Sequence, residues 1–222
     1  MARQVIGDKV LKKIFSEAIG TFTLIFLGAG AIVSGKADLQ GVALAHGLAI
    51  FVMVSALAGI SGAHFNPAVS AAMFATKRIC GQDFLYFVLA QLAGATLASI
   101  ALNYIYGNSN GYGLPAIASA TSVGAGVLAE ILGTATLLIV IFGVAVDKRS
   151  VAASHPGLPI GLTITAVILS VGPITGAALN PARWFGPALV SGDWSNAWVY
   201  ILAPTVGAVL AAVAYSAVAK PE

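Results

Sequence analysis

Apolar residues in this chain gather into six long segments, and this pattern limits the possible folds more than any other feature. A bilayer core of about 30 Å needs about 20 apolar residues in a spanning helix. Each segment meets that length when its ends are included, although the fifth is short and continues into an apolar loop. The predicted spans are residues 14–34, 41–60, 84–105, 124–146, 158–172 and 197–219.

The composition excludes several classes of protein. Only 9% of the 222 residues are charged and 59% are hydrophobic, whereas an ordinary soluble domain is about 25% charged. A disordered chain, a nucleic-acid-binding module and a soluble enzyme with an ordinary surface are therefore excluded. The single cysteine, Cys80, excludes an intramolecular disulfide and a cysteine metal cluster. No Ser-His-Asp set or phosphate-binding loop stands out, so we expect no catalytic residue, metal or cofactor.

Two further apolar segments, residues 66–76 and 180–190, are too short to cross a membrane. Eleven helical residues rise only about 16 Å, roughly half a bilayer. Both segments open with the same tripeptide, Asn-Pro-Ala, and asparagine followed by proline is a typical start of a helix. The two motifs are Asn66, Pro67 and Ala68, and Asn180, Pro181 and Ala182.

The basic residues predict how the chain lies in the membrane. With six spans, nine of the eleven Lys and Arg residues lie on the side that holds both termini. Cytoplasmic loops carry the excess of positive charge, so we expect both termini in the cytoplasm. Short loops and tails favour a plasma membrane. The nine residues are Arg3, Lys9, Lys12, Lys13, Lys77, Arg78, Lys148, Arg149 and Lys220.

The two halves of the chain repeat each other at an offset of 113 or 114 residues. Glu17-Ala-Ile-Gly-Thr corresponds to Glu130-Ile-Leu-Gly-Thr, and the two Asn-Pro-Ala motifs also correspond. Because each half has three spans, the second half enters the membrane from the opposite face. We therefore predict a single all-α domain over residues 1–222, built from an inverted repeat of residues 12–105 and 124–219.

This repeat brings the two short helices together near the middle of the membrane. Each helix N-terminus carries about half a positive charge, and the amides of Asn66 and Asn180 add hydrogen-bond donors. Such a midplane repels cations and protons but admits neutral solutes that form hydrogen bonds. The bland alternative is that both asparagines only cap their helices. The backbone carbonyls expected to line the path are those of Ala63, His64, Phe65, Gly176, Ala178 and Leu179.

Together these motifs resemble the aquaporin, or major intrinsic protein, family over the whole chain. The stretches that carry the resemblance are Ser-Gly-Ala-His-Phe-Asn-Pro-Ala-Val, residues 61–69, and Asn-Pro-Ala-Arg-Trp-Phe-Gly-Pro-Ala, residues 180–188. The resemblance implies six tilted helices with two re-entrant half-helices and one pore in each subunit. It also implies a homotetramer in a lipid bilayer.

The resemblance places four residues at an outer constriction: His46, Ile168, Ala177 and Arg183. Strict water channels have Phe and His in this ring, and glycerol channels have a bulky aromatic residue with Gly. The present set is most similar to that of plant tonoplast intrinsic proteins, which pass water and often ammonia or urea. We expect backbone carbonyls to hold Arg183 in the pore, and His46 to offer solutes a hydrogen bond that Ile168 cannot.

Three further residues have two interpretations each. Glu17 and Glu130 are repeat mates inside spans, and the resemblance makes them structural acceptors for the loops that feed the half-helices. The rival interpretation is a proton relay. Trp184 follows Arg183 directly, and it either wedges behind the arginine or anchors the chain at the membrane interface. The interfacial position is the favoured one.

The sequence therefore predicts a passive, non-enzymatic channel for water, with ammonia or other small neutral solutes also admitted and ions and protons excluded. A glycerol or urea facilitator on the same fold is the nearest alternative. A proton-coupled transporter is the alternative from another class, since inverted repeats and broken helices also occur there.

Overall fold

Eight α-helices make up the fold in the computed structural model, which describes the backbone of residues 2–219 and the side chains of residues 8–219. Six of the helices are long and apolar enough to cross a membrane. The predicted fold class is confirmed. The long helices are α1 (Ala2–Val33), α2 (Leu39–Ser61), α4 (Gly81–Tyr106), α5 (Val123–Ile141), α6 (Gly157–Thr175) and α8 (Ala197–Val218), and the short ones are α3 (Pro67–Ala75) and α7 (Pro181–Ser191).

The helix bounds differ from the predicted spans mainly where a helix leaves the apolar layer. Helix α1 begins at Ala2 rather than at residue 14, because its first turns are helical but polar, and hydropathy marks only the membrane part. The fourth span changes to a π-helical turn, η2, over Phe142–Val146. The long uncharged loop contains one short 3-10 turn, η1, over Asn110–Gly113. Lys220, one of the predicted cytoplasmic cations, lies outside the described residues.

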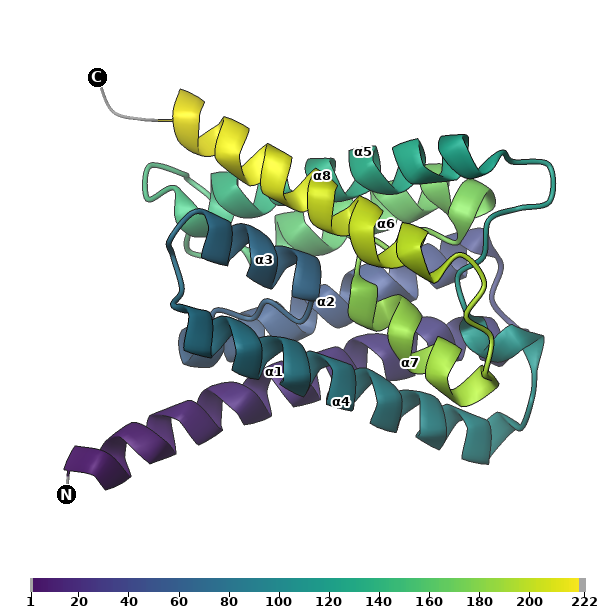
Figure 1. The fold of residues 1–222 in the computed structure, drawn as a ribbon, viewed down its shortest axis with the longest axis horizontal. Coiled ribbons are helices and arrows are strands. Elements are labelled where there is room, and N and C mark those ends of the chain that lie inside the picture. The colour runs from purple at the N-terminus through teal and green to yellow at the C-terminus, as the bar shows by residue number, and fades with distance from the viewer. Residues whose placement is uncertain (1, 220–222) are drawn as a thin grey trace.

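The two halves pack as counterparts of each other. Helix α1 packs against α4 in the first half, as α5 packs against α8 in the second. Each half-helix then packs against the last span of the other half, α3 on α8 and α7 on α4. In Figure 1 the N-terminal ends of α3 and α7 meet near the middle of the molecule, and α1 begins on the same side where α8 ends. This is the arrangement of an inverted repeat.

Glycines allow the long helices of each half to approach closely. A Cβ atom on Gly94 would overlap the carbonyl oxygen of Ala18, and one on Gly207 would overlap the carbonyl oxygen of Ile131. The two glycines occupy equivalent positions in the repeat. Small residues at such crossings let helix backbones touch in lipid, where packing rather than the hydrophobic effect drives association.

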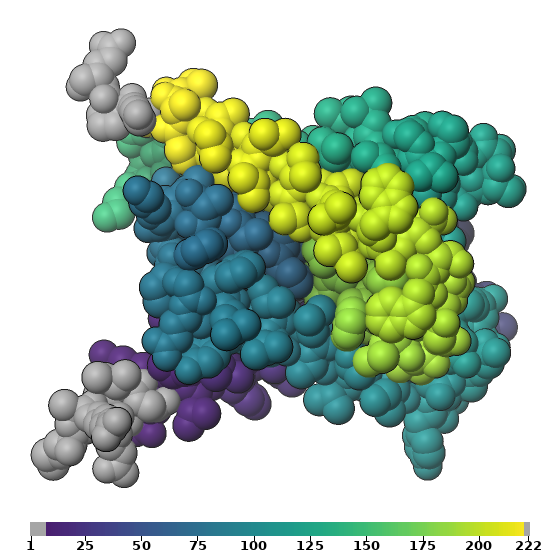
Figure 2. Space-filling model, viewed as in Figure 1, coloured from purple at the N-terminus to yellow at the C-terminus, as the bar shows by residue number. Residues whose placement is uncertain are grey.

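The outer surface of the bundle is apolar along the spans. Figure 2 shows α8 as a ridge between α5 and the surface formed by α3 and α4. Large side chains on its outer face, such as Leu202 and Leu210, are more than half exposed. A surface of this kind suits lipid, since apolar side chains need no water contact there.

Candidate functional site

One cavity of about 400 Å³ lies between the two halves. Helix α2 lines it with His46, Ile50, Val54 and Ala58, and α6 lines it with Ile160, Ile164 and Ile168. Side chains four residues apart share one face of a helix, so each helix contributes one stripe. Both stripes are almost wholly apolar, which leaves hydrogen bonding in the cavity to the loops and to the residues at its ends.

The loops before the half-helices have an unusual backbone that exposes peptide groups. Ala63 and Phe65 have φ near +50°, and their repeat counterparts Ala177 and Leu179 have φ of 47° and 55°. Residues with a Cβ rarely adopt this conformation, and each instance costs on the order of 1–3 kcal/mol. The surroundings must therefore hold both loops in place.

Glu17 holds the first of these loops. Its carboxylate accepts hydrogen bonds from the backbone N–H of His64 at 3.0 Å and of Phe65 at 2.7 Å. It also accepts from the hydroxyl of Ser61 at 2.6 Å and from the side-chain amide of Gln91 at 2.7 Å. The carboxylate is completely buried, so these four donors replace the water that it loses.

Glu130 holds the second loop in the same way. It accepts from the Thr175 hydroxyl at 2.6 Å and from the backbone N–H of Ala178 and Leu179 at 2.9 and 2.8 Å. Its counterpart of Gln91 is Pro204, which has no side-chain donor. Neither Glu130 nor Glu17 is among the described residues that line the cavity. Both acids therefore accept hydrogen bonds from the loops they hold, and neither borders the cavity as described.

Asn66 and Asn180 each perform two tasks. The Oδ1 atom of Asn66 accepts from Ala68 N at 2.8 Å, and that of Asn180 accepts from Ala182 N at 2.9 Å, so both cap their helices. The amide nitrogen of Asn66 donates to the Leu179 carbonyl at 2.8 Å, and that of Asn180 donates to the Phe65 carbonyl at 2.9 Å. These two crossed hydrogen bonds join the halves and leave one N–H on each amide for a solute.

The crossed bonds also refine the expectation for the six lining carbonyls. Those of Phe65 and Leu179 already accept one hydrogen bond each, so only their second lone pair is available. Of the other four residues, Ala63, His64 and Ala178 line the cavity. Gly176 does not line it as described, but it directly precedes the lining residue Ala177. His64 is held at the cavity wall by Ser70, whose Oγ lies 3.0 Å from its Nδ1.

The four residues expected at the constriction come together at one end of the cavity. His46, Ile168, Ala177 and Arg183 all line it and are 2–4% exposed. Arg183 stands in the first turn of α7, and its Nη1 donates to the Gly113 carbonyl at 2.7 Å. The opposite end is bordered by Arg78, Ile79 and Pro156.

The expectation that His46 offers solutes a hydrogen bond is wrong. Its Nδ1 lies 2.9 Å from the Val42 carbonyl, which can only accept, so Nδ1 carries the proton. Its Nε2 then accepts from Nε of Arg183 at 3.0 Å. Both ring nitrogens are engaged, and the imidazole is neutral. Among the four side chains of this ring, the polar groups left for a solute are the guanidinium N–H groups of Arg183 that bind neither His46 nor Gly113.

The favoured interfacial position of Trp184 is also wrong. The side chain is completely buried and stacks on Tyr200, with ring centroids 5.7 Å apart and planes 9° from parallel. Helix α7 turns this face towards α8 rather than towards the membrane surface. The Tyr200 hydroxyl donates to the Thr175 carbonyl at 2.9 Å, so the stacked pair supports the loop that Glu130 holds. Trp184 thus packs behind the four residues of the expected constriction, next to Arg183.

Several contributors to the site have little signal in the sequence. Gly113 and Val42 act only through backbone carbonyls, which every residue has. Gly113 adopts φ of +66° and lies against Ala29, so a side chain there would be crowded and its backbone strained. Gln91 is part of the repeat, but nothing in its spacing predicts that it donates to Glu17 and to Ser70.

Comparison with known proteins gives consistent results. The family described as Major intrinsic protein matches residues 5–215. Aquaporin NIP1-1 of Zea mays is 42% identical, over 97% of this chain and 77% of its own length. Glycerol uptake facilitator protein-like 6 of Lactiplantibacillus plantarum is 41% identical, over 91% of this chain and 95% of its own length. The structure of an aquaglyceroporin from Plasmodium falciparum superposes with a TM-score of 0.85 at 27% identity, covering 93% and 95% of the two chains.

Proposed function

The chain belongs to the major intrinsic protein family, whose members are membrane channels and not enzymes, and on this premise we propose that it is a passive channel for water. Ammonia or other small neutral solutes also pass, and ions and protons are excluded. The observation that carries the proposal is the cavity of about 400 Å³ between the two halves, which the residues of the expected constriction line at one end: His46, Ile168, Ala177 and Arg183.

The selectivity follows from the charges around that cavity. Arg183 places a full positive charge at the narrow end, and the N-termini of α3 and α7 add their partial positive charges at the middle. Cations therefore meet two barriers. The side-chain amides of Asn66 and Asn180 each have one N–H that is free to donate to a solute. A water molecule at this point accepts these hydrogen bonds, and its orientation is thereby fixed. Such an orientation interrupts the chain of donors that proton transfer requires.

The pore belongs to one subunit, and the family relationship supports a homotetramer of such subunits. The distribution of Lys and Arg supports cytoplasmic termini, and the short loops support a plasma membrane location. These features belong to the proposal, with residues 1–222 forming a single channel domain.

A glycerol or urea facilitator is the second candidate. Ile168 and Ala177 leave the ring with little polar surface, and His46 has no free polar atom. Relatives named for glycerol uptake and aquaglyceroporin activity support this candidate. By contrast, a proton-coupled transporter would need an acid in the path, and the described lining contains neither Glu17 nor Glu130.

Stopped-flow light scattering of proteoliposomes separates these candidates. Vesicles with the purified chain should shrink faster than empty vesicles when challenged with sucrose. A water channel gives fast shrinkage with slow re-entry of glycerol or urea. Fast re-swelling in glycerol or urea would show that the chain is a facilitator for that solute and not a strict water channel. Flux that saturates and follows an imposed proton gradient would contradict both channel hypotheses and support a proton-coupled transporter.

A further inference from the structure

A second hollow, of about 310 Å³, adjoins the end of the pore cavity opposite Arg183, on the side of the molecule where α1 begins and α8 ends, and Arg78 and Val146 line both. Its walls come from the turn after α3, the loop after η2 and the last two turns of α8. These last turns close the sixth span, Ala197–Val218. The hollow therefore lies at the depth where lipid headgroups meet the protein.

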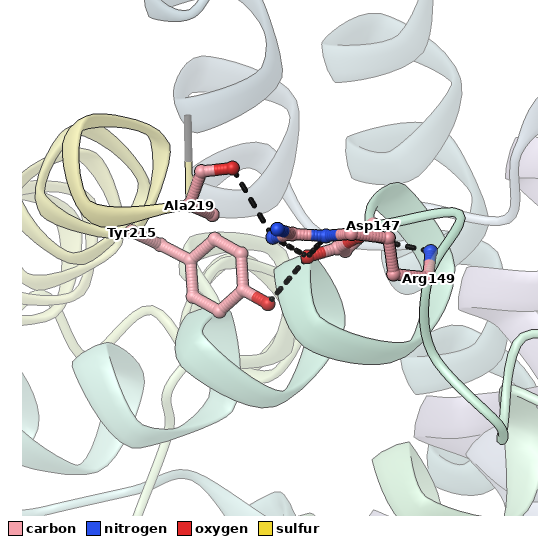
Figure 3. Close-up of polar contacts among 4 residues, drawn as sticks. All are labelled: Asp147, Arg149, Tyr215 and Ala219. Carbon is pink, nitrogen blue, oxygen red and sulfur yellow. Dashed lines mark hydrogen bonds and ion pairs between the residues drawn. The ribbon is translucent and has the colours of Figure 1, made fainter. Parts of the chain in front are cut away.

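The loop side of this hollow is fastened to α8 by one cluster of polar contacts, drawn in Figure 3. Arg149 donates to the Asp147 carboxylate from Nε at 2.9 Å and from Nη2 at 2.7 Å, and Nη2 also donates to the Ala219 carbonyl at 3.1 Å. The Tyr215 hydroxyl donates to the same carboxylate at 3.2 Å. The one acid among the described wall residues, Asp147, is thus already paired with a cation, and these contacts tie the loop to α8.

The other cations in the wall have no such partner. Within residues 8–219, Arg78 and Lys148 form neither an ion pair nor a side-chain hydrogen bond. The guanidinium of Arg78 lies 5.1 Å from the centroid of the Phe142 ring, and this cation–π contact holds it in position. With Arg149 offset by Asp147, these two side chains leave two positive charges in excess among the described residues around the hollow.

A third group in the wall also lacks a partner. The Oγ atom of Ser216 is shielded from solvent, and no described residue forms a hydrogen bond with it. Buried hydroxyls in proteins nearly always have a partner. Because this hydroxyl has almost no accessible surface, an anion in the hollow would meet the two cations and not Ser216.

We propose that this hollow binds a phosphate group, either of an anionic lipid headgroup or of free phosphate. Arg78 and Lys148 supply the charge, with a planar guanidinium and a compact ammonium that both suit phosphate oxygens. The fastened pair of Asp147 and Arg149 keeps the loop in place. Basic pockets at the membrane surface between spans are sites where anionic headgroups bind.

The proposal is independent of which solutes cross the pore. The test is native mass spectrometry of the full chain in detergent, titrated separately with dioctanoyl phosphatidylglycerol, dioctanoyl phosphatidylcholine and inorganic phosphate at one ionic strength. We expect the anionic lipid to bind in preference to the zwitterionic lipid. The double variant Arg78→Gln/Lys148→Gln should bind it about tenfold more weakly or worse, and Ser216→Ala, which removes only a shielded hydroxyl, should bind it as the wild type does.

The matched control is Lys9→Gln/Lys12→Gln, which removes two exposed cations from the same side of the molecule but outside the hollow. It should bind the anionic lipid as the wild type does, and size-exclusion elution should show that both double variants are folded. Displacement of the lipid by inorganic phosphate would assign free phosphate as the ligand. Equal binding of both lipids, equal losses in the two double variants, or no binding of lipid or phosphate would each overturn the proposal.

Discussion

The Nε atom of Arg183 donates a hydrogen bond to Nε2 of His46 over 3.0 Å, and this contact joins α7 to α2 at the end of the cavity where we propose the constriction. It fixes the direction of the guanidinium and removes the imidazole from contact with solutes. On the proposed function, the ring would then select by its width and by one charge rather than by two polar side chains.

Replacing His46 with alanine should widen this ring. The variant loses both the imidazole volume and the acceptor that holds Arg183, so glycerol and urea should enter roughly tenfold faster, with water flux retained. Stopped-flow re-swelling measures the change. His155→Ala is the matched control, because His155 is exposed in the loop before α6 and its loss should leave solute entry unchanged. Unaltered entry of glycerol and urea in His46→Ala would contradict the placement of His46 at the constriction.

Replacing Glu17 or Glu130 with glutamine should destabilise the fold. Each hydrogen bond to a buried carboxylate is worth about 1.5–3 kcal/mol, and an amide can satisfy only part of the donor set. Glu17 accepts from four donors and Glu130 from three, so Glu17→Gln should lower the melting temperature more. Asp8→Asn, at an exposed site on α1, is the control and should melt like the wild type. Unchanged melting of both Glu variants would show that the loops do not depend on these acids.

Alanine at Gly20 should disturb the first loop through one side chain. A Cβ atom there would overlap the ring of Phe65, and Phe65 carries the carbonyl that accepts from Asn180. We expect lower stability and slower water flux. Gly59→Ala is the control within α2: it meets open space and should be neutral or stabilising by up to about 1 kcal/mol. Equal behaviour of the two variants would contradict the packing described for Gly20.

Mercurials should inhibit the wild-type channel weakly. Cys80 is exposed and does not line the cavity as described. Ala177 lines the cavity at the proposed constriction, so Ala177→Cys should convert the chain into one whose water flux is blocked by low concentrations of mercurial and restored by a thiol. Strong block of the wild type would mean that Cys80 controls the path.

The contact between Asp147 and Arg149 should persist in mild acid. The Arg149 guanidinium holds the pKa of the Asp147 carboxyl well below its ordinary value of about 4. A depressed pKa in the folded state stabilises the fold above the unfolded-state pKa, and this contribution is lost as the pH falls towards the folded-state pKa. The difference in melting temperature between wild type and Asp147→Asn should therefore be constant from pH 7 to about 5 and narrow towards pH 3. A difference that widens in acid would contradict this assignment.

Much of the fold follows from the sequence, because hydropathy and the internal repeat are strong signals. The six spans and the two half-helices are predicted close to their observed bounds, and the start of α1 is missed because a helix can continue beyond the membrane with polar residues. Hydropathy detects the apolar layer and not the backbone conformation.

The candidate site is less predictable, since much of it is made by backbone atoms. Arg183 is expected to bind carbonyls, but Gly113 as the acceptor cannot be chosen from a long loop without a charge. The engagement of both nitrogens of His46 depends on a contact across 137 residues. The predicted interfacial position of Trp184 is wrong because tryptophan is common both at membrane interfaces and in cores. Only the packing of α7 on α8 decides between the two positions.

The central claim is that water crosses the chain through the ring next to the half-helices. The most direct measurement is the osmotic shrinkage rate of proteoliposomes containing wild type, Ala177→Trp or Ala214→Trp. Ala177 lies in the ring and Ala214 on the exposed side of α8. We predict fast shrinkage for wild type and Ala214→Trp, and a rate close to that of empty vesicles for Ala177→Trp. Fast shrinkage of folded Ala177→Trp, or a wild type no faster than empty vesicles, would contradict the account.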